Sequence, residues 1–165
     1  MTAAAQTRDR DALALAILRI SVGALFLIFA EYKVFGTQFT LHGGFQFWIN
    51  RFLEDGAYPF MKPILKNFVL PHAKPLAFLV AYGELAIGIS LVTGILVRAA
   101  SFFGLVFMLS LLFSANYPGP QAPLWQYFGA SLDHSVLVLC FLAFLIGRAD
   151  TALSLRSLWR QSKTA

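Results

Sequence analysis

Six ionisable residues interrupt the long apolar stretches of this chain, and their types could support proton transfer or the binding of a polar ligand. A charged side chain at the centre of a bilayer costs about 2.5 to 3.5 kcal/mol on insertion scales, so such residues usually face other helices and mark a functional site. A carboxylate or an imidazole can move protons, and basic side chains can hold an anion or a carbonyl oxygen. The six are Arg19, Glu31, Lys33, Glu84, Asp133 and His134.

Two of these residues are expected to form a pair. Glu84 lies nine residues after Pro75 in an apolar run, which places it about 14 Å into a helix. Helical side chains tilt toward their own N-terminus, so Lys33 on an outward-running first span and Glu84 on a returning second span approach each other, whereas Arg19 and Glu84 diverge. We therefore predict a Glu84–Lys33 pair with His134 nearby, in a polar pocket that opens toward the outer face. Glu84 and His134 are the candidate catalytic residues, and the candidate substrate-binding residues are Lys33, Arg19, Glu31 and Asp133.

A structural role remains open for each of these groups. A buried ion pair can fix helix register without doing chemistry. Arg19 could merely extend its charge to the membrane surface, or it could join the pocket through water. Asp133 could serve only to favour the first turn of its helix. The three histidines show no metal-ligand spacing, and we predict no metal, haem or flavin.

The composition predicts that lipid surrounds the apolar stretches in which these residues lie. The chain has 165 residues, of which 58% are hydrophobic and 13% charged, and its mean hydropathy is +0.69, outside the usual balance of soluble domains. Runs of about 20 apolar residues are typical of membrane-spanning helices. We predict an all-α integral membrane four-helix bundle in a single domain, residues 1–165, with spans at about 12–35, 75–97, 98–117 and 129–147.

The first connection contains an apolar stripe at helical spacing, which predicts an amphipathic helix at about 43–55. The stripe consists of Phe45, Trp48, Ile49, Phe52 and Leu53. Such a helix can lie among the lipid headgroups or cap the bundle, and docking of a partner protein is the alternative.

Aromatic and small residues on the spans allow two further expectations. The third span is rich in phenylalanine and should face lipid or core, or else line an apolar slot for a quinone ring or prenyl tail; its members are Phe102, Phe103, Phe107 and Phe113. Small residues permit close helix approach in membranes, which we expect at Gly83, Gly88, Gly94 and Gly104.

Basic residues flank the spans mainly on one side. Lysine and arginine in short flanks favour the cytoplasm, so both termini are predicted to be cytoplasmic. The residues concerned are Arg8, Arg10, Arg98, Arg148, Arg156, Arg160 and Lys163, while residues 118–130 contain no lysine or arginine. Topology thus explains the net charge of +5 without nucleic acid as a partner. Cys140 is the only cysteine, which excludes a disulfide within the chain.

Several short motifs occur in a recognisable order. They are Arg19-x-x-x-Gly23 followed by Lys33, then Glu84-x-x-x-Gly88, Gly94-x-x-x-Arg98, and Gly147-Arg148 followed by TALSL. In order and spacing the chain resembles, over nearly all of residues 12–160, the DoxX family of small four-helix membrane proteins, related to the DoxD-type subunit of thiosulfate:quinone oxidoreductase. Ala30 stands where such proteins often have glycine shortly before the lysine.

The resemblance implies a bacterial inner-membrane protein, with some relatives in quinone-linked sulfur oxidation and others in redox-stress complexes. The sequence itself carries no cysteine pair, haem motif or flavin fingerprint, so electron transfer requires a bound quinone or a partner subunit. The first hypothesis is a quinone-linked oxidoreductase subunit. The alternative is a non-catalytic scaffold or assembly partner of a redox complex; a homo-oligomer is compatible with both.

Overall fold

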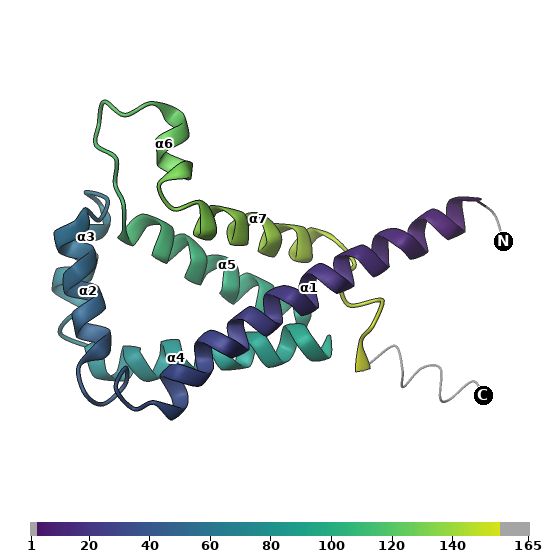
Figure 1. The fold of residues 1–165 in the computed structure, drawn as a ribbon, viewed down its shortest axis with the longest axis horizontal. Coiled ribbons are helices and arrows are strands. Elements are labelled where there is room, and N and C mark those ends of the chain that lie inside the picture. Colours follow the sequence, from purple (N-terminus) through teal and green to yellow (C-terminus); the bar gives the residue numbers. More distant parts are fainter. Residues whose placement is uncertain (1–2, 156–165) are drawn as a thin grey trace.

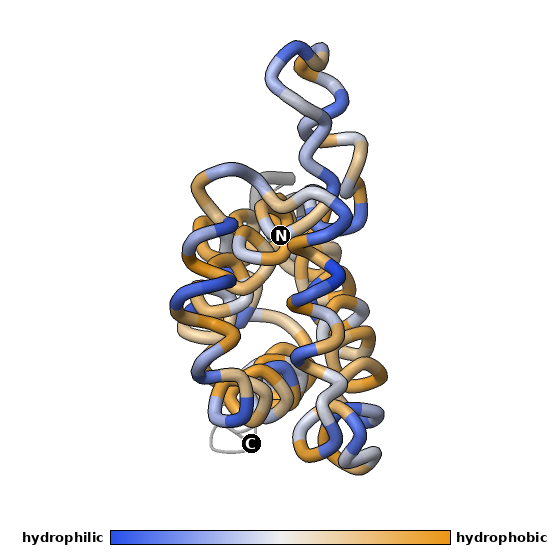
Figure 2. The backbone as a smooth tube through the Cα atoms, turned by 90° about the vertical axis from the view of Figure 1, so that its left-hand side faces the viewer, coloured by the Kyte–Doolittle hydropathy of each residue, from blue (hydrophilic) through white to orange (hydrophobic). Residues whose placement is uncertain are grey.

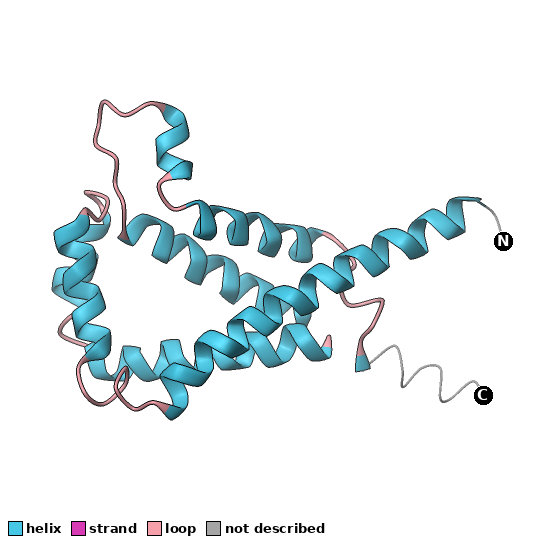
Figure 3. Cartoon of the chain, viewed as in Figure 1, coloured by secondary structure: helices cyan, strands magenta, loops and turns pink. Residues whose placement is uncertain are grey.

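The chain forms helices joined by short connections throughout the part that the structure describes. The computed structural model describes residues 3–155, with side chains from residue 10 onward (Figure 1). The elements are α1 (Ala3–Phe35), α2 (Gly44–Asp55), α3 (Met61–Ile64), the π-helix η1 (Leu65–Val69), α4 (Ala73–Thr93), α5 (Val97–Ser114), α6 (Leu124–Gly129) and α7 (Leu132–Ile146). No strand occurs between residues 3 and 155, as expected for an all-α fold (Figure 3).

Within the described part of the chain, three helices are long and apolar enough to cross a membrane. They cover Arg10–Phe35 of α1, Ala73–Thr93 and Val97–Ser114. At 1.5 Å per residue, the 18 residues of α5 rise about 27 Å, close to the hydrocarbon thickness of about 30 Å. The apolar helix α7 lies inside the predicted fourth span but has only 15 residues and rises about 22 Å. It is shorter than expected because residues 129–131 belong to the end of α6 and the turn before α7.

The helices pack as two pairs. α1 packs mainly against α4, α5 packs mainly against α7, and α5 also contacts α4. The pairs meet near the tight α4–α5 turn, where Gly94 and Leu96 adopt positive φ angles of 75° and 54°. They separate toward the other end, where α2 and α3 stand across the gap (Figure 1). Figure 2 looks onto that end, where hydrophilic stretches interrupt an otherwise largely hydrophobic tube.

Glycines set the close approaches between paired helices. A Cβ on Gly23 would lie 2.8 Å from the Cβ of Leu91, and one on Gly88 would lie 2.8 Å from Leu27. α1 and α4 therefore touch where only glycine fits. The expected approach at Gly83 is absent, because a Cβ there would meet nothing within 4 Å.

α2 occupies the region of the predicted amphipathic helix and turns one face inward. Phe45 and Ile49 are buried in a cluster with alanines from the first half of α4, and Phe52 and Leu53 pack partly buried against it. Trp48 belongs to the predicted stripe but is 46% exposed. α2 therefore packs through a narrower apolar face than the sequence pattern indicated.

The start of α1, the start of α5 and the segment after α7 lie at one end of the molecule (Figure 1). This end carries Arg10, Arg98 and Arg148, three of the residues on which the orientation prediction rests. The orientation prediction also rests on Arg156, Arg160 and Lys163, which lie outside the described residues, and on Arg8, whose side chain is not described.

Candidate functional site

Glu84 and Lys33 form a buried ion pair between α4 and α1. The Lys33 ammonium donates to both carboxylate oxygens of Glu84, with Nζ 2.5 Å from Oε1 and 2.6 Å from Oε2. The Glu84 side chain is 5% exposed and that of Lys33 is 18% exposed. The ammonium also lies 5.2 Å from the centroid of the Phe39 ring, within the range of a cation–π contact. The structure thus brings together the two residues whose side-chain tilts were expected to converge.

Local sequence explains how the helices hold this pair. Glu84 is one turn from Gly88, and at that glycine α4 comes close enough to contact Leu27 on α1. Lys33 lies in the last turn of α1, where a cation also suits the partial negative charge of the helix C-terminus. The close crossing brings α1 near enough for the lysine side chain to reach back to the carboxylate.

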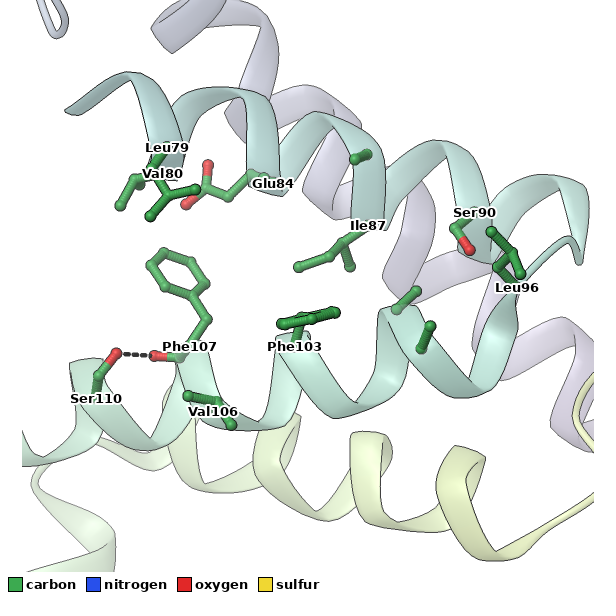
Figure 4. A pocket seen from close by; sticks show the side chains of 14 residues that line it. Leu79, Val80, Glu84, Ile87, Ser90, Leu96, Phe103, Val106, Phe107 and Ser110 are labelled. Carbon is green, nitrogen blue, oxygen red and sulfur yellow. Dashed lines mark hydrogen bonds between the residues drawn. The ribbon is translucent and has the colours of Figure 1, made fainter. Parts of the chain in front are cut away.

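An apolar cavity of about 520 Å³ lies beside Glu84, between α4 and α5. Phe103 and Phe107 of α5 face α4 across it, near Ile87 and Glu84 (Figure 4). The complete lining is Leu79, Val80, Gly83, Glu84, Ala86, Ile87, Ser90, Leu96, Ala99, Ala100, Phe103, Val106, Phe107 and Ser110. Its size is in the range of ligand-binding pockets, which are mostly apolar with few polar groups.

The two hydroxyl groups in this lining already have acceptors. Ser110 Oγ donates to the Phe107 carbonyl at 2.7 Å (Figure 4), and Ser90 Oγ donates to the Ile95 carbonyl. Glu84, which is paired with Lys33, is therefore the strongest polar feature of this lining. Together, the cavity and the pair could hold a largely apolar ligand that carries an oxygen-containing group.

Arg19 lies away from this pair. It is 14 residues before Lys33 on the same helix, a rise of about 21 Å. Its side chain is fully buried, and Nη2 donates to the Leu153 carbonyl at 2.7 Å, which fastens the segment after α7 to α1. A Cβ on Gly94 would collide with Arg19 Nη1 and with Ser154. Gly94 is therefore a close contact of Arg19.

His134, Asp133 and Glu31 are also not joined to the pair. His134 Nδ1 lies 3.2 Å from Asp133 Oδ1 on α7, and Asp133 is 73% exposed in the first turn of that helix. α5 packs against both α7 and α4, so it lies between His134 and the α4 side of the cavity, and His134 is not among the lining residues. Glu31 is exposed on α1, two residues from Lys33 and on another side of the helix.

A family model places the chain among known proteins. The model for DoxX matches residues 14–117. The chain belongs to the DoxX family. The match in this DoxX protein runs from α1 through α5 and so includes Lys33, Glu84 and the whole cavity lining. Comparisons with curated proteins and with solved structures found no match.

An aromatic cluster in this DoxX protein had no clear signal in the sequence, because its members are far apart in the chain: in the connection after α2, at the end of α5, in the connection before α6 and on α6. The Tyr58 ring centroid lies 4.9 Å from that of Tyr117, 5.3 Å from that of Phe113 and 6.3 Å from that of Tyr127. Tyr58 donates its hydroxyl to the Tyr127 carbonyl at 3.3 Å and its backbone N–H to the Phe113 carbonyl at 3.0 Å. Burial raises the pKa of Tyr58, and the neighbouring Tyr127 and Tyr117 raise it further. The cluster ties the connection after α2 to the end of α5.

The histidines outside α7 contact backbone rather than each other. His42 Nδ1 lies 3.3 Å from the Thr37 carbonyl oxygen, and His72 Nδ1 lies 2.8 Å from that of Phe68. Within the described residues, no group of three or more histidine, cysteine or acidic side chains could hold a metal ion.

Proposed function

We propose that this DoxX-family membrane protein is a subunit of a quinone-linked oxidoreductase. In this proposal the quinone ring lies in the cavity between α4 and α5, with one carbonyl oxygen beside the Glu84–Lys33 pair. The observation that supports it most is an apolar cavity of about 520 Å³ whose lining includes the buried Glu84, a carboxylate that is itself paired with the Lys33 ammonium.

The position of the pair favours a ligand that dissolves in the bilayer. Glu84 lies 11 residues after the start of α4 and nine before its end, about 16 Å and 14 Å along the helix axis. If α4 spans the membrane, the pair is near mid-depth. An uncharged quinone can reach that depth, whereas a charged water-soluble substrate pays a large desolvation cost to do so.

The two residues have distinct roles in this proposal. A quinone takes up two electrons and two protons when it is reduced to the quinol. The Lys33 ammonium, which has a third N–H beyond the two that reach Glu84, donates a hydrogen bond to the carbonyl oxygen. The Glu84 carboxylate takes up a proton from water and passes it to that oxygen, and the second proton reaches the other carbonyl oxygen from water. The electrons come from a partner subunit that oxidises its own reduced substrate.

The membrane arrangement belongs to the same proposal. We place the chain in a bacterial inner membrane, with α7 as a fourth span and both termini in the cytoplasm. The short flanks with Arg10, Arg98 and Arg148 support this orientation.

A non-catalytic scaffold is the second candidate. Both oxygens of Glu84 are bonded to Lys33, at a contact between two helices, which is how a pair that only fixes helix register would look. In that case the protein would hold a redox partner without binding quinone itself.

Retention of quinone separates these candidates. Organic extracts of gently purified protein would be measured by mass spectrometry for wild type, Glu84→Gln and the matched control Glu31→Gln, which alters an exposed glutamate outside the cavity. The proposal expects quinone in wild type and in Glu31→Gln, and its loss in Glu84→Gln. A stoichiometric partner protein, with no quinone in folded wild type, would favour the scaffold.

A further inference from the structure

The cavity beside Glu84 is elongated along the helices. On α5 its lining runs from Ala99 to Ser110, a rise of about 17 Å. On α4 it starts at Leu79, passes Glu84 and reaches Ser90, and it then includes Leu96 in the turn to α5. The longer part therefore extends from Glu84 toward the α4–α5 turn.

This longer part offers its occupant no free charge and no free hydroxyl donor. Glu84 is neutralised by Lys33, and the hydroxyl of Ser90 donates to a backbone carbonyl. Several lining side chains are also largely exposed, including Leu96 at 74%, Phe103 at 63% and Val106 at 51%. The cavity is thus open along the side of the helices that would face lipid, and it fits an uncharged, apolar, elongated chain.

We infer that this part of the cavity holds the isoprenoid tail of the quinone, which runs from Glu84 toward the α4–α5 turn. The inference rests on the proposed function and adds the tail site and its direction. A phospholipid is a poorer fit because its charged headgroup stays at the membrane surface, whereas the polar pair lies near the middle of α4. A quinone has an uncharged headgroup and can place it beside the pair.

Two small residues keep the two parts of the cavity open. Gly83 lines the cavity next to Glu84, and a Cβ there would meet nothing within 4 Å. Ala99 lines the far part, near the turn, and is exposed. A Cβ at Gly83 meets no neighbour and Ala99 is exposed, so a larger side chain at either position can extend into the cavity. A larger residue at Gly83 would therefore fill the ring position, and one at Ala99 would fill the tail position.

The test compares two ligands with the same ring, a quinone with a long isoprenoid tail and the analogue without a tail, by titration onto purified protein in detergent. Ala99→Phe is expected to weaken binding of the tailed quinone by about tenfold or more, since losing contact with about two methylene-sized groups has that effect. It should leave the tail-less analogue unchanged. Gly83→Leu should weaken both, while its thermal unfolding shows that the variant is folded. The matched control is Ala24→Phe, an exposed alanine on α1 outside the cavity, which should change neither.

The possible results separate the tail site from the proposed function. If Ala99→Phe weakens the binding of both ligands equally, or of neither, while Glu84→Gln still removes quinone, the tail site is refuted and the proposed function stands. If folded wild type binds neither ligand, both fail. If phospholipid alone is retained and its amount falls in Ala99→Phe, the cavity holds an acyl chain and the inference of a quinone tail is overturned.

Discussion

Lys33→Met would remove the ammonium from the ion pair and leave the Glu84 carboxylate buried without its partner. Glu84 is 5% exposed, so little water can reach it to replace the lost hydrogen bonds. Breaking a buried ion pair from one side typically costs about 3–5 kcal/mol. Because the Lys33 side chain is 18% exposed, some solvent already reaches the pair, and we expect a loss of about 3 kcal/mol in the free energy of unfolding.

The double variant Lys33→Met with Glu84→Gln removes both charges at once. Replacing a buried pair by uncharged groups of similar size is often nearly neutral, so the double variant should be much more stable than Lys33→Met alone. The resulting coupling energy should be about 1.5 kcal/mol or more, within the range found for residues in contact.

The assay is unfolding by SDS in mixed micelles for wild type, both single variants and the double variant. A second cycle on Arg51 and Asp55 serves as the control, because these residues form an ion pair at 2.6 Å on α2 but are 55% and 41% exposed. Exposed helix pairs contribute about 0.3–0.5 kcal/mol. A coupling for Lys33 and Glu84 no larger than that of the control pair would refute the buried pair.

Three further predictions concern other parts of the molecule. Gly88→Leu should destabilise the fold by about 1–3 kcal/mol in thermal unfolding, because its Cβ would lie 2.8 Å from Leu27; an unchanged melting temperature would contradict the close crossing of α1 and α4. Arg19→Ala should speed backbone amide exchange in the segment after α7, since it removes the bond to the Leu153 carbonyl, but quinone binding should stay unchanged; loss of quinone with normal exchange would mean that Arg19 acts in the ligand site. Burial raises the pKa of Tyr58, so its contribution to stability is full below the unfolded pKa of about 10 and is lost as the pH rises through the folded value. Stability measured over a series of alkaline pH values should therefore fall less steeply in Tyr58→Phe than in wild type, and equal slopes would show that this tyrosine does not contribute.

The long apolar helices and the Glu84–Lys33 contact could be predicted from sequence because each depends on local geometry. A helix rises by a constant amount per residue, which fixes depth, and its side chains tilt toward its N-terminus, which fixes direction. These two rules were enough to bring Lys33 and Glu84 together and to separate Arg19 from Glu84.

The position of His134 relative to the pair could not be predicted in the same way. The depth of a residue along its helix does not determine which helices are neighbours. α7 packs on α5, which itself packs against α4, and this order of helices has no signal in the sequence. The bond from Arg19 to the Leu153 carbonyl could not be predicted for the same reason, because Leu153 lies more than a hundred residues away in the chain.

The cavity illustrates a second limit of sequence reasoning. From the sequence, Phe103 and Phe107 could face lipid, face the core or line an apolar slot. Only the cavity between α4 and α5 favours the slot. Gly83 was expected to mark a helix contact, as Gly88 does, because both are small residues in the same span. The two differ only in which side of α4 they occupy, and α1 covers just one of those sides.

The most direct test of the account is the quinone content of the purified protein, measured by mass spectrometry of organic extracts from wild type, Glu84→Gln and Glu31→Gln. Binding of quinone beside the Glu84–Lys33 pair predicts an isoprenoid quinone in wild type and Glu31→Gln, and little or none in Glu84→Gln. Quinone that is absent from folded wild type, or that is retained equally by all three proteins, would contradict it.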